Sequence, residues 1–406
     1  MGIKRGQRPL EAADSWSIDT APGRVLYGAG VIDLLGEVVH EYGGRRVLVV
    51  SDPGVAAAGH VDRAAVALGG DDLEVSVFYG VEENPGERNV AAAAAAARAY
   101  EADFLIGLGG GSAMDCAKGA NFVFTNGGRM EDYWGFGKAS KPMLPSIGVP
   151  CTAGTGSEAQ SFAVISREDD HRKMACGDPK ARFVATLLDP ELVRTAPPEV
   201  MAATGLDALS HALESFVCTA ANPYSRMFAS EGFARLLRGF DAVVHAQAAT
   251  DGSAGRGRRE AELVELWGEM LLGAHLAGAA IEASMLGAAH GLANPLTARY
   301  DITHGVAVAV MLDHVLRFNG EGSEYGGLAQ LAFGDARGNG LASERLAKLW
   351  TDLRASARVA GRLRDLGVLE ADLDLLSTQA AEQWTAQFNP RSASASDMLA
   401  LYRAAF

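Results

Sequence analysis

The chain has 406 residues, more than one compact core ordinarily spans, so we expect two domains. Hydrophobic residues make up 48% of the chain and charged residues 21%, a composition typical of soluble globular proteins. The formal net charge of −14 predicts a surface that repels nucleic acids and anionic membranes, so we expect neither as a partner.

Four cysteines and the start of the chain bear on the cellular compartment. Cys116, Cys151, Cys176 and Cys218 form no C-x-x-C pair, which is typical of free thiols in a reducing compartment. Residues 1–23 are polar and lack the apolar stretch of a signal peptide. No uncharged apolar run is long enough to span a membrane. The sequence therefore predicts a cytoplasmic protein.

The first half of the chain alternates strand-like and helix-like segments. Runs rich in β-branched residues predict strands at 45–52, 73–81, 104–108 and 144–150. Helical stretches such as 30–42 and 89–101 lie between them. This alternation is typical of parallel strands joined by crossover helices, with helices on both faces of the sheet. We expect an α/β domain with a Rossmann-like parallel sheet.

The pattern changes near residue 190, where prolines punctuate the chain. Beyond that point the sequence is mostly helical, with few β-branched runs. We therefore predict an α/β domain at 1–190 and an all-α domain at 191–406. Within the second domain, 247–259 is rich in Gly, Ala, Ser and Arg, which predicts a surface loop between helices.

A glycine loop follows the strand predicted at 104–108. Residues 109–112 read Gly-Gly-Gly-Ser and lead into a helical segment. Glycines let backbone amides approach a phosphate closely, and a helix N-terminus adds a partial positive charge. The loop differs from G-x-G-x-x-G, so the usual dinucleotide fingerprint is absent. A phosphate site is one interpretation, and a tight turn with a serine cap is the other.

A second polar loop, PCTAGTGSE at 150–158, follows the fourth predicted strand. Hydroxyls and glycines at the carboxyl end of a parallel strand suit a ligand crevice. A polar capping loop would show the same pattern.

Asp52 stands at the end of the strand predicted at 45–52. A carboxylate there can bind the ribose hydroxyls of adenosine and repel a 2′-phosphate, which favours NAD over NADP. A turn aspartate before Pro53 and Gly54 is the alternative.

Asp207 and His211 stand four residues apart in a mostly apolar helical segment, so their side chains share one face. Burying them unpaired would be costly, so they either bond each other or bind something. His290 and His304 follow in apolar or glycine-rich surroundings. One carboxylate and three imidazoles suit Fe(II) or Zn(II). Satisfied core histidines are the alternative to a four-ligand site.

Four sequence blocks, taken in their order along the chain, resemble the iron-containing (group III) alcohol dehydrogenase family. They are IGLGGGSAMDCAKG, TAGTGSE, ATGLDALSHALES and the pair His290-x13-His304 before GVAVAVMLDHVLRFN. The resemblance extends from residue 25 to about residue 319. It implies the dehydroquinate synthase-like fold of that family: a dinucleotide-binding α/β domain, an all-helical domain, and a cofactor and metal in the cleft between them. It also implies a homo-oligomer.

The resemblance assigns site residues position by position. The positions that match the metal ligands are Asp207, His211, His290 and His304, with Fe(II) favoured and Zn(II) the alternative. The positions that match contacts to NAD(H) are Asp52, Asn84, Gly110, Gly111, Ser112, Asp115, Thr152, Thr155, Val164 and Lys173. Among these, Gly110 to Ser112 match the pyrophosphate loop, and the two threonines match positions along the nicotinamide.

The sequence departs from the family pattern at two positions. Many relatives carry a second histidine four residues after the ligand that matches His290, and here that position is Asn294. An amide cannot exchange a proton near neutral pH, so a histidine proton relay is in doubt. Cys151 replaces the first threonine of the usual pair, which changes packing more than chemistry.

The implied activity is hydride transfer between NAD(H) and a small alcohol or aldehyde, with the metal as a Lewis acid. By position, Phe162 and Ile281 line the substrate pocket, with Ala283 and Met285 nearby. That apolar mix of modest volume favours a short aliphatic substrate. No side chain is an obvious general acid.

Three alternatives stay open beside a dehydrogenase. A maleylacetate reductase-like enzyme shares the fold but lacks the metal set, which is intact here. A dehydroquinate synthase-like lyase has a glutamate among its ligands, where this chain offers an aspartate. An NAD-binding protein without catalysis would not need a complete ligand set.

Overall fold

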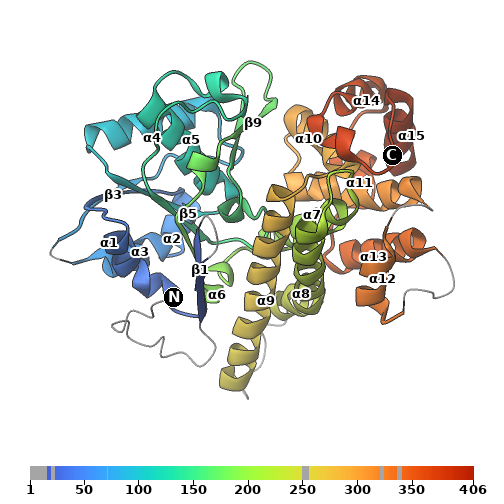
Figure 1. The fold of residues 1–406 in the computed structure, drawn as a ribbon. Coiled ribbons are helices and arrows are strands. Elements are labelled where there is room, and N and C mark those ends of the chain that lie inside the picture. The colour runs from blue at the N-terminus through green and yellow to red at the C-terminus, as the bar shows by residue number, and fades with distance from the viewer. Residues whose placement is uncertain (1–15, 20–22, 71, 249–255, 321–323, 336–340) are drawn as a thin grey trace.

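The computed structural model describes residues 16–19, 23–70, 72–248, 256–320, 324–335 and 341–406. An α/β half and a helical half lie beside each other (Figure 1). Most of the polar stretch at 1–23 lies outside the described residues. So does the middle of the loop predicted at 247–259, whose two ends belong to helices.

The centre of the α/β half is a seven-stranded sheet. Its strands, in spatial order, are β1 (Trp16–Asp19), β2 (Arg24–Tyr27), β10 (Ala185–Leu188), β7 (Ser146–Pro150), β5 (Phe104–Gly109), β3 (Arg46–Val50) and β4 (Glu74–Phe78). β1 pairs antiparallel with β2, and all other neighbours pair in parallel. The four predicted strands are confirmed as β3, β4, β5 and β7.

Helices cover both faces of this sheet because its strands are apolar on both sides. In β3, Val47 and Val49 pack with α1 (Leu35–Glu41) and α3 (His60–Leu68). Leu48 and Val50 face the opposite side and pack with α4 (Glu87–Ala99) and α5 (Gly111–Asn126). The helix predicted at 89–101 is α4. The one predicted at 30–42 begins instead as a 3-10 turn, η1 (Val31–Leu34), before α1.

A small sheet that the sequence analysis did not predict packs against α5. It consists of β6 (Gly135–Phe136), β9 (Lys173–Gly177) and β8 (Phe162–Ser166), with β8 and β9 antiparallel. Side chains alternate between the faces of a strand. In β8, Ala163 and Ile165 therefore enter the core, while Phe162 and Val164 line a cavity. The small sheet thus turns one face toward the site described below.

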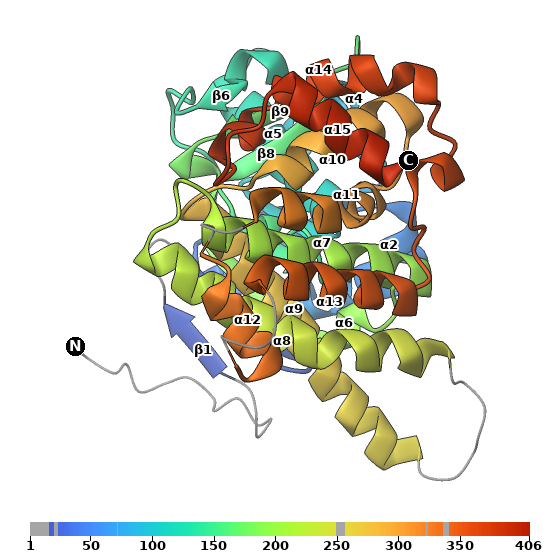
Figure 2. The same ribbon diagram turned by 90° about the vertical axis from the view of Figure 1, so that its right-hand side faces the viewer.

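The described residues after β10 form helices, as predicted. They are α6 (Pro190–Val193), α7 (Pro198–Val217), α8 (Pro223–Ala248), α9 (Arg256–Glu282), α10 (Ala288–Tyr300), α11 (His304–Asn319), α12 (Gly326–Phe333), α13 (Ala342–Ser356), α14 (Leu373–Ala381) and α15 (Ala395–Ala405). Figure 2 shows α7 and α11 running side by side within this half. α7 is buried on nearly all sides because α8, α9 and α11 surround it. Among the described helices, none is long and apolar enough to cross a membrane.

The two halves meet along α9. A Cβ on Gly278 of α9 would lie 2.4 Å from the carbonyl oxygen of Gly156, so the backbones touch and only glycine fits. At the end of α9, Glu282 accepts hydrogen bonds from the amide (3.0 Å) and hydroxyl (2.8 Å) of Ser161 and pairs with Arg182. The α/β half is therefore fixed to the helical half beside the cavity.

Candidate active site

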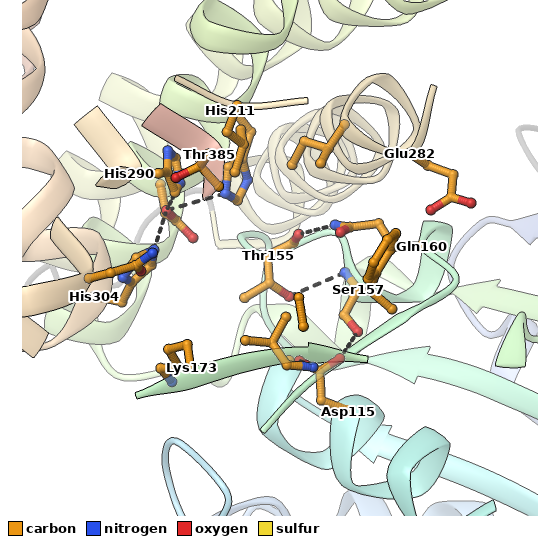
Figure 3. Close-up of a pocket in the computed structure, with 18 of the residues that line it drawn as sticks. Asp115, Thr155, Ser157, Gln160, Lys173, His211, Glu282, His290, His304 and Thr385 are labelled. Atoms are coloured by element: carbon orange, nitrogen blue, oxygen red, sulfur yellow. Dashed lines mark hydrogen bonds and ion pairs between the residues drawn. The ribbon is translucent and has the colours of Figure 1, made fainter. Parts of the chain in front are cut away.

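A cavity of about 420 Å³ lies between the two halves, with walls from both (Figure 3). The glycine loop, the 150–158 loop and the small sheet contribute one side. α7, the end of α9, and the beginnings of α10 and α11 contribute the other. All four predicted metal ligands line it.

The predicted metal ligands converge on one carboxylate oxygen. Asp207 Oδ1 lies 3.4 Å from His211 Nε2, 3.5 Å from His290 Nε2 and 4.0 Å from His304 Nε2. The rings of His211 and His290 stack at 4.9 Å between centroids. Ligand atoms of Asp207, His290 and His304 all lie within 4.8 Å of one another. Two residues come from one face of α7, and the two histidines come from the first turns of α10 and α11.

Several polar atoms of this cluster have no hydrogen-bond partner among the described residues. Asp207 Oδ1 and His290 Nε2 are buried and have no hydrogen-bond partner among the described residues. Burial lowers the pKa of His211 to about 4 and that of His304 to about 3, so both imidazoles are neutral at pH 7. Burial alone would raise the pKa of Asp207, but the three histidines hold it well below its usual value. Burial alone would lower the pKa of His290 as well, but the carboxylates of Asp207 and Glu214 raise it to about 9. A carboxylate ringed by three imidazoles, two of them neutral at pH 7, is a donor set that fits a divalent cation.

The predicted pyrophosphate loop has the shape that a close ligand requires. Gly109 ends β5 with φ of 148°, which a side chain would disfavour, and α5 begins at Gly111. A Cβ on Gly111 would lie only 2.7 Å from the side chain of Thr155, so any larger residue at this position would collide with the polar loop. Ser112 also lines the cavity. The N-terminus of α5 therefore borders the cavity, and a helix N-terminus favours an anion such as a phosphate.

Three predicted cofactor positions, Gly110, Thr152 and Asp52, are not among the residues that line the cavity. A Cβ on Gly110 would lie 3.5 Å from Thr152 Oγ1, so these two residues adjoin. Asp52 Oδ1 accepts the amide of Val55 at 2.9 Å and caps the short helix that follows. Its Oδ2 lies 3.2 Å from where a Cβ on Gly109 would stand. The alternative for Asp52, a turn aspartate, is therefore present as a helix cap next to the glycine loop.

Asp115 braces the cavity wall through protein contacts. Its Oδ1 accepts the hydroxyl of Ser157 at 2.5 Å and lies 3.1 Å from Lys118 Nζ, and its Oδ2 accepts the amide of Val164 at 3.2 Å. Lys118 is fully buried and also donates to the carbonyl of Phe162. These bonds join α5, the polar loop and the small sheet into one wall.

Asn84 and Lys173 meet at the edge of the cavity. Lys173 Nζ donates to Asn84 Oδ1 at 2.5 Å, and Asn84 has φ of 53°. Burial lowers the pKa of Lys173 to about 8, although Asp115 and Glu83 oppose the shift. A neutral amine is therefore accessible at mildly alkaline pH.

One end of the cavity is apolar. Phe162 and Ile281 line it as predicted, together with Met285, whereas Ala283 does not. The ring of Phe162 lies 5.9 Å from that of Trp384, which belongs to η7 (Trp384–Phe388) in the helical half. The cavity is thus closed at this end by an aromatic pair that joins the two halves.

Two functional contacts escaped the sequence analysis because their partners are far apart in the chain. Glu214 bonds His290, which is 76 residues away, and Asn294 Nδ2 donates to Gln383 Oε1 at 3.0 Å across 89 residues. Glu214 follows His211 by three residues on a helix, and that spacing was an available signal. No pattern in the sequence pointed to Trp384 or Gln383 as site residues.

Family models describe nearly the whole chain. The model for iron-containing alcohol dehydrogenases matches residues 22–190, and the model for the C-terminal part of that family matches residues 201–406. The chain belongs to the iron-containing alcohol dehydrogenase family. This confirms the family suggested by the four sequence blocks, and with it the enzyme class, an oxidoreductase that acts on alcohols and aldehydes.

Individual relatives agree with this assignment over nearly their full lengths. Alcohol dehydrogenase 4 of Schizosaccharomyces pombe is 33% identical over 95% of this chain and 88% of its own. The 1,3-propanediol dehydrogenase of Klebsiella pneumoniae is 32% identical over 95% and 97%. A crystal structure of a 1,3-propanediol oxidoreductase superposes with a TM-score of 0.87 at 30% identity, covering 97% of this chain and 99% of that one. The two-part fold is therefore that of the family.

Proposed function

We propose that this enzyme transfers hydride between NAD(H) and a short alcohol or aldehyde, using one divalent metal held by Asp207, His211, His290 and His304. The observation that carries the proposal is the convergence of three imidazoles on one buried carboxylate oxygen, inside a cavity that the glycine loop also reaches. Fe(II) is the favoured ion, and Zn(II) suits the same ligands. The metal supplies a Lewis acid for the substrate oxygen.

The chain's own residues bind and orient the two reactants. The amides at Gly110 to Ser112 receive the pyrophosphate, and Asp52 receives the adenosine ribose. Thr152 and Thr155 flank the nicotinamide, with Asn84, Asp115, Val164 and Lys173 completing the cofactor side. Phe162 and Ile281 hold the carbon chain of the substrate and exclude water from it, which favours hydride transfer over side reactions.

The proposal is tested by removing the metal. Purified protein is stripped with a chelator, and NADH loss is followed with a panel of short aldehydes, with and without added Fe(II) or Zn(II). We expect activity to return only with metal, and the ion that restores the higher rate identifies the better fit. Activity that persists without metal would instead support a maleylacetate reductase-like mechanism and contradict the ligand set.

Three further features belong to the proposal. The domains divide at residue 190, which is supported by the gap between the two family matches and by the end of β10 at Leu188. The protein is cytoplasmic, which is supported by four buried free cysteines. It forms a homo-oligomer, as the family resemblance implies, and sedimentation tests this directly.

A further inference from the structure

One of the predicted ligands has a carboxylate behind it. His290 Nδ1 lies 2.5 Å from Oε2 of Glu214, a residue that is 3% exposed. The other oxygen of Glu214, Oε1, accepts the amide of Ala289 at 2.7 Å. Both oxygens of this carboxylate are therefore occupied by hydrogen-bond donors.

This contact decides which ring nitrogen of His290 carries the proton. A neutral imidazole has one N–H and one lone pair, and an ionised carboxylate only accepts hydrogen bonds. In the neutral ring that a metal requires, Glu214 therefore keeps the proton on Nδ1 and leaves the lone pair on Nε2. Nε2 is the atom that points into the cluster, 3.5 Å from Asp207 Oδ1, and it has no partner among the described residues.

The two other histidines of the cluster have no carboxylate hydrogen-bonded to Nδ1 among the described residues. The backbone of Gly154 supports His211, and Nδ1 of His304 is buried without a partner in the described part of the chain. Glu214 also shares its face of α7 with two ligands, because Asp207, His211 and Glu214 follow the i, i+4, i+7 spacing of a helix. One helical face thus presents two ligands and holds a third in place.

We propose that Glu214 is a positioning residue that fixes the tautomer and orientation of His290 for metal binding. The inference rests on the proposed metal site and adds to it a residue outside the ligand set. Carboxylates in this position typically raise metal affinity by about 10- to 100-fold. The competing explanation is that Glu214 only caps the first turn of α10, where Asn389 Oδ1 accepts the amide of Ala288 at 3.2 Å.

Glu214→Gln separates these explanations. A glutamine offers one oxygen and one NH₂ group, so either orientation sets an N–H against an N–H donor. If the NH₂ group faces His290 Nδ1, the ring proton moves to Nε2 and blocks the lone pair. Glu158→Gln is the matched control, since Glu158 Oε1 lies 3.2 Å from Nδ1 of the buried His275, a histidine outside the ligand set.

The experiment titrates Co(II) into metal-free, full-length protein against a competing chelator and follows the visible absorption of the bound ion. We expect Glu214→Gln to weaken Co(II) binding by about 10- to 100-fold, and Glu158→Gln to leave it unchanged. In a His290→Ala background, Glu214→Gln should have no further effect on Co(II) affinity, because its target is gone. A loss that persisted in that background would show a general structural role and overturn the proposal.

The outcomes also separate this inference from the proposed function. Wild-type protein that binds Co(II), together with a Glu214→Gln variant that binds it equally well, would overturn the role of Glu214 alone. Wild-type protein that binds no Co(II) would overturn the metal site and the inference together. Thermal melting of the metal-free variants detects any that fail to fold, and for such a variant the His290→Ala cycle is repeated with Glu214→Asp.

Discussion

At the scale of single residues, the site depends on Asp207, because its Oδ1 faces all three imidazoles. Without a cation that oxygen is buried with no hydrogen-bond donor in the described structure. The geometry is therefore costly to the metal-free protein and becomes favourable only with a positive charge at its centre.

Asp207→Asn keeps the shape of the side chain and removes its charge. We expect the variant to lose at least about 100-fold in metal affinity, more than a supporting residue would cost, and to lose NADH-dependent activity with it. Metal content per chain after dialysis and the NADH assay measure the two effects. A variant that kept its metal would show that the three histidines bind it without the carboxylate.

The low pKa of Lys173 predicts a pH dependence of stability. In the folded protein Lys173 loses its proton at about pH 8, against 10.5 for an ordinary lysine. Between these values the unfolded chain binds more protons, so this residue makes the free energy of unfolding rise with pH, by at most about 1.4 kcal/mol per pH unit. Below pH 8, Lys173 lowers the free energy of unfolding by an amount that does not change with pH.

Denaturant unfolding of wild type and Lys173→Met between pH 7 and 10 measures this effect. The difference between the two proteins should change with pH above 8 and stay level below it. Parallel curves across the whole range would mean that Lys173 titrates normally.

Asn294 lines the cavity where many relatives carry a histidine. Asn294→His introduces a group that titrates near pH 6.5 and can still donate to Gln383. We expect a new ionisation near that pH in the profile of kcat/KM. If neither the rate nor the profile changes, this position has no part in proton transfer.

At the scale of elements, the contact between α9 and the polar loop depends on two glycines. We expect Gly278→Ala to destabilise the protein by about 1 to 3 kcal/mol, because its Cβ would overlap the carbonyl of Gly156 and force α9 away. Gly326→Ala in α12 is the control, since nothing lies within 4 Å of its Cβ. Equal melting temperatures for the two variants would show that α9 moves at no cost.

The arrangement of the elements explains which strands and site residues could be predicted from the sequence and which could not. β3, β5 and β7 are buried on both faces, so their apolar runs were visible, and the ligands of α7 were visible through helical spacing. β9 reads Lys-Met-Ala-Cys-Gly and carries no run of β-branched residues. The short apolar run of β8 has no helical stretch between it and β9 to continue the strand–helix alternation. The bond between Glu214 and His290 required the packing of α10 on α7, which local pattern does not contain.

At the scale of the whole molecule, the cavity exists because the two halves close on each other. Trp384 comes from the helical half and Phe162 from the α/β half, and their rings meet at 5.9 Å. Glu282 adds a polar tie beside them, to Ser161 and Arg182. The size of the accepted substrate is thus set by how the halves fit together as well as by side chains in one wall.

Trp384→Ala should therefore admit larger substrates. We expect kcat/KM for a branched or aryl aldehyde to rise by about 10-fold relative to propanal, a change on the scale of one methylene group in an apolar pocket. Propanal serves as the internal reference, because the ratio of the two substrates cancels any general loss of activity. An unchanged ratio would place the limit on size elsewhere in the cavity.

The shared cavity also imposes an order of loading. The ligands from α7, α10 and α11 form one wall of the same space that the glycine loop and the small sheet line from the other side. A nicotinamide lying between them would stand in the path of an ion travelling to or from Asp207. The cation must then enter first, and a bound dinucleotide should trap it, so a chelator would extract metal more slowly from the enzyme in the presence of NAD(H) than in its absence.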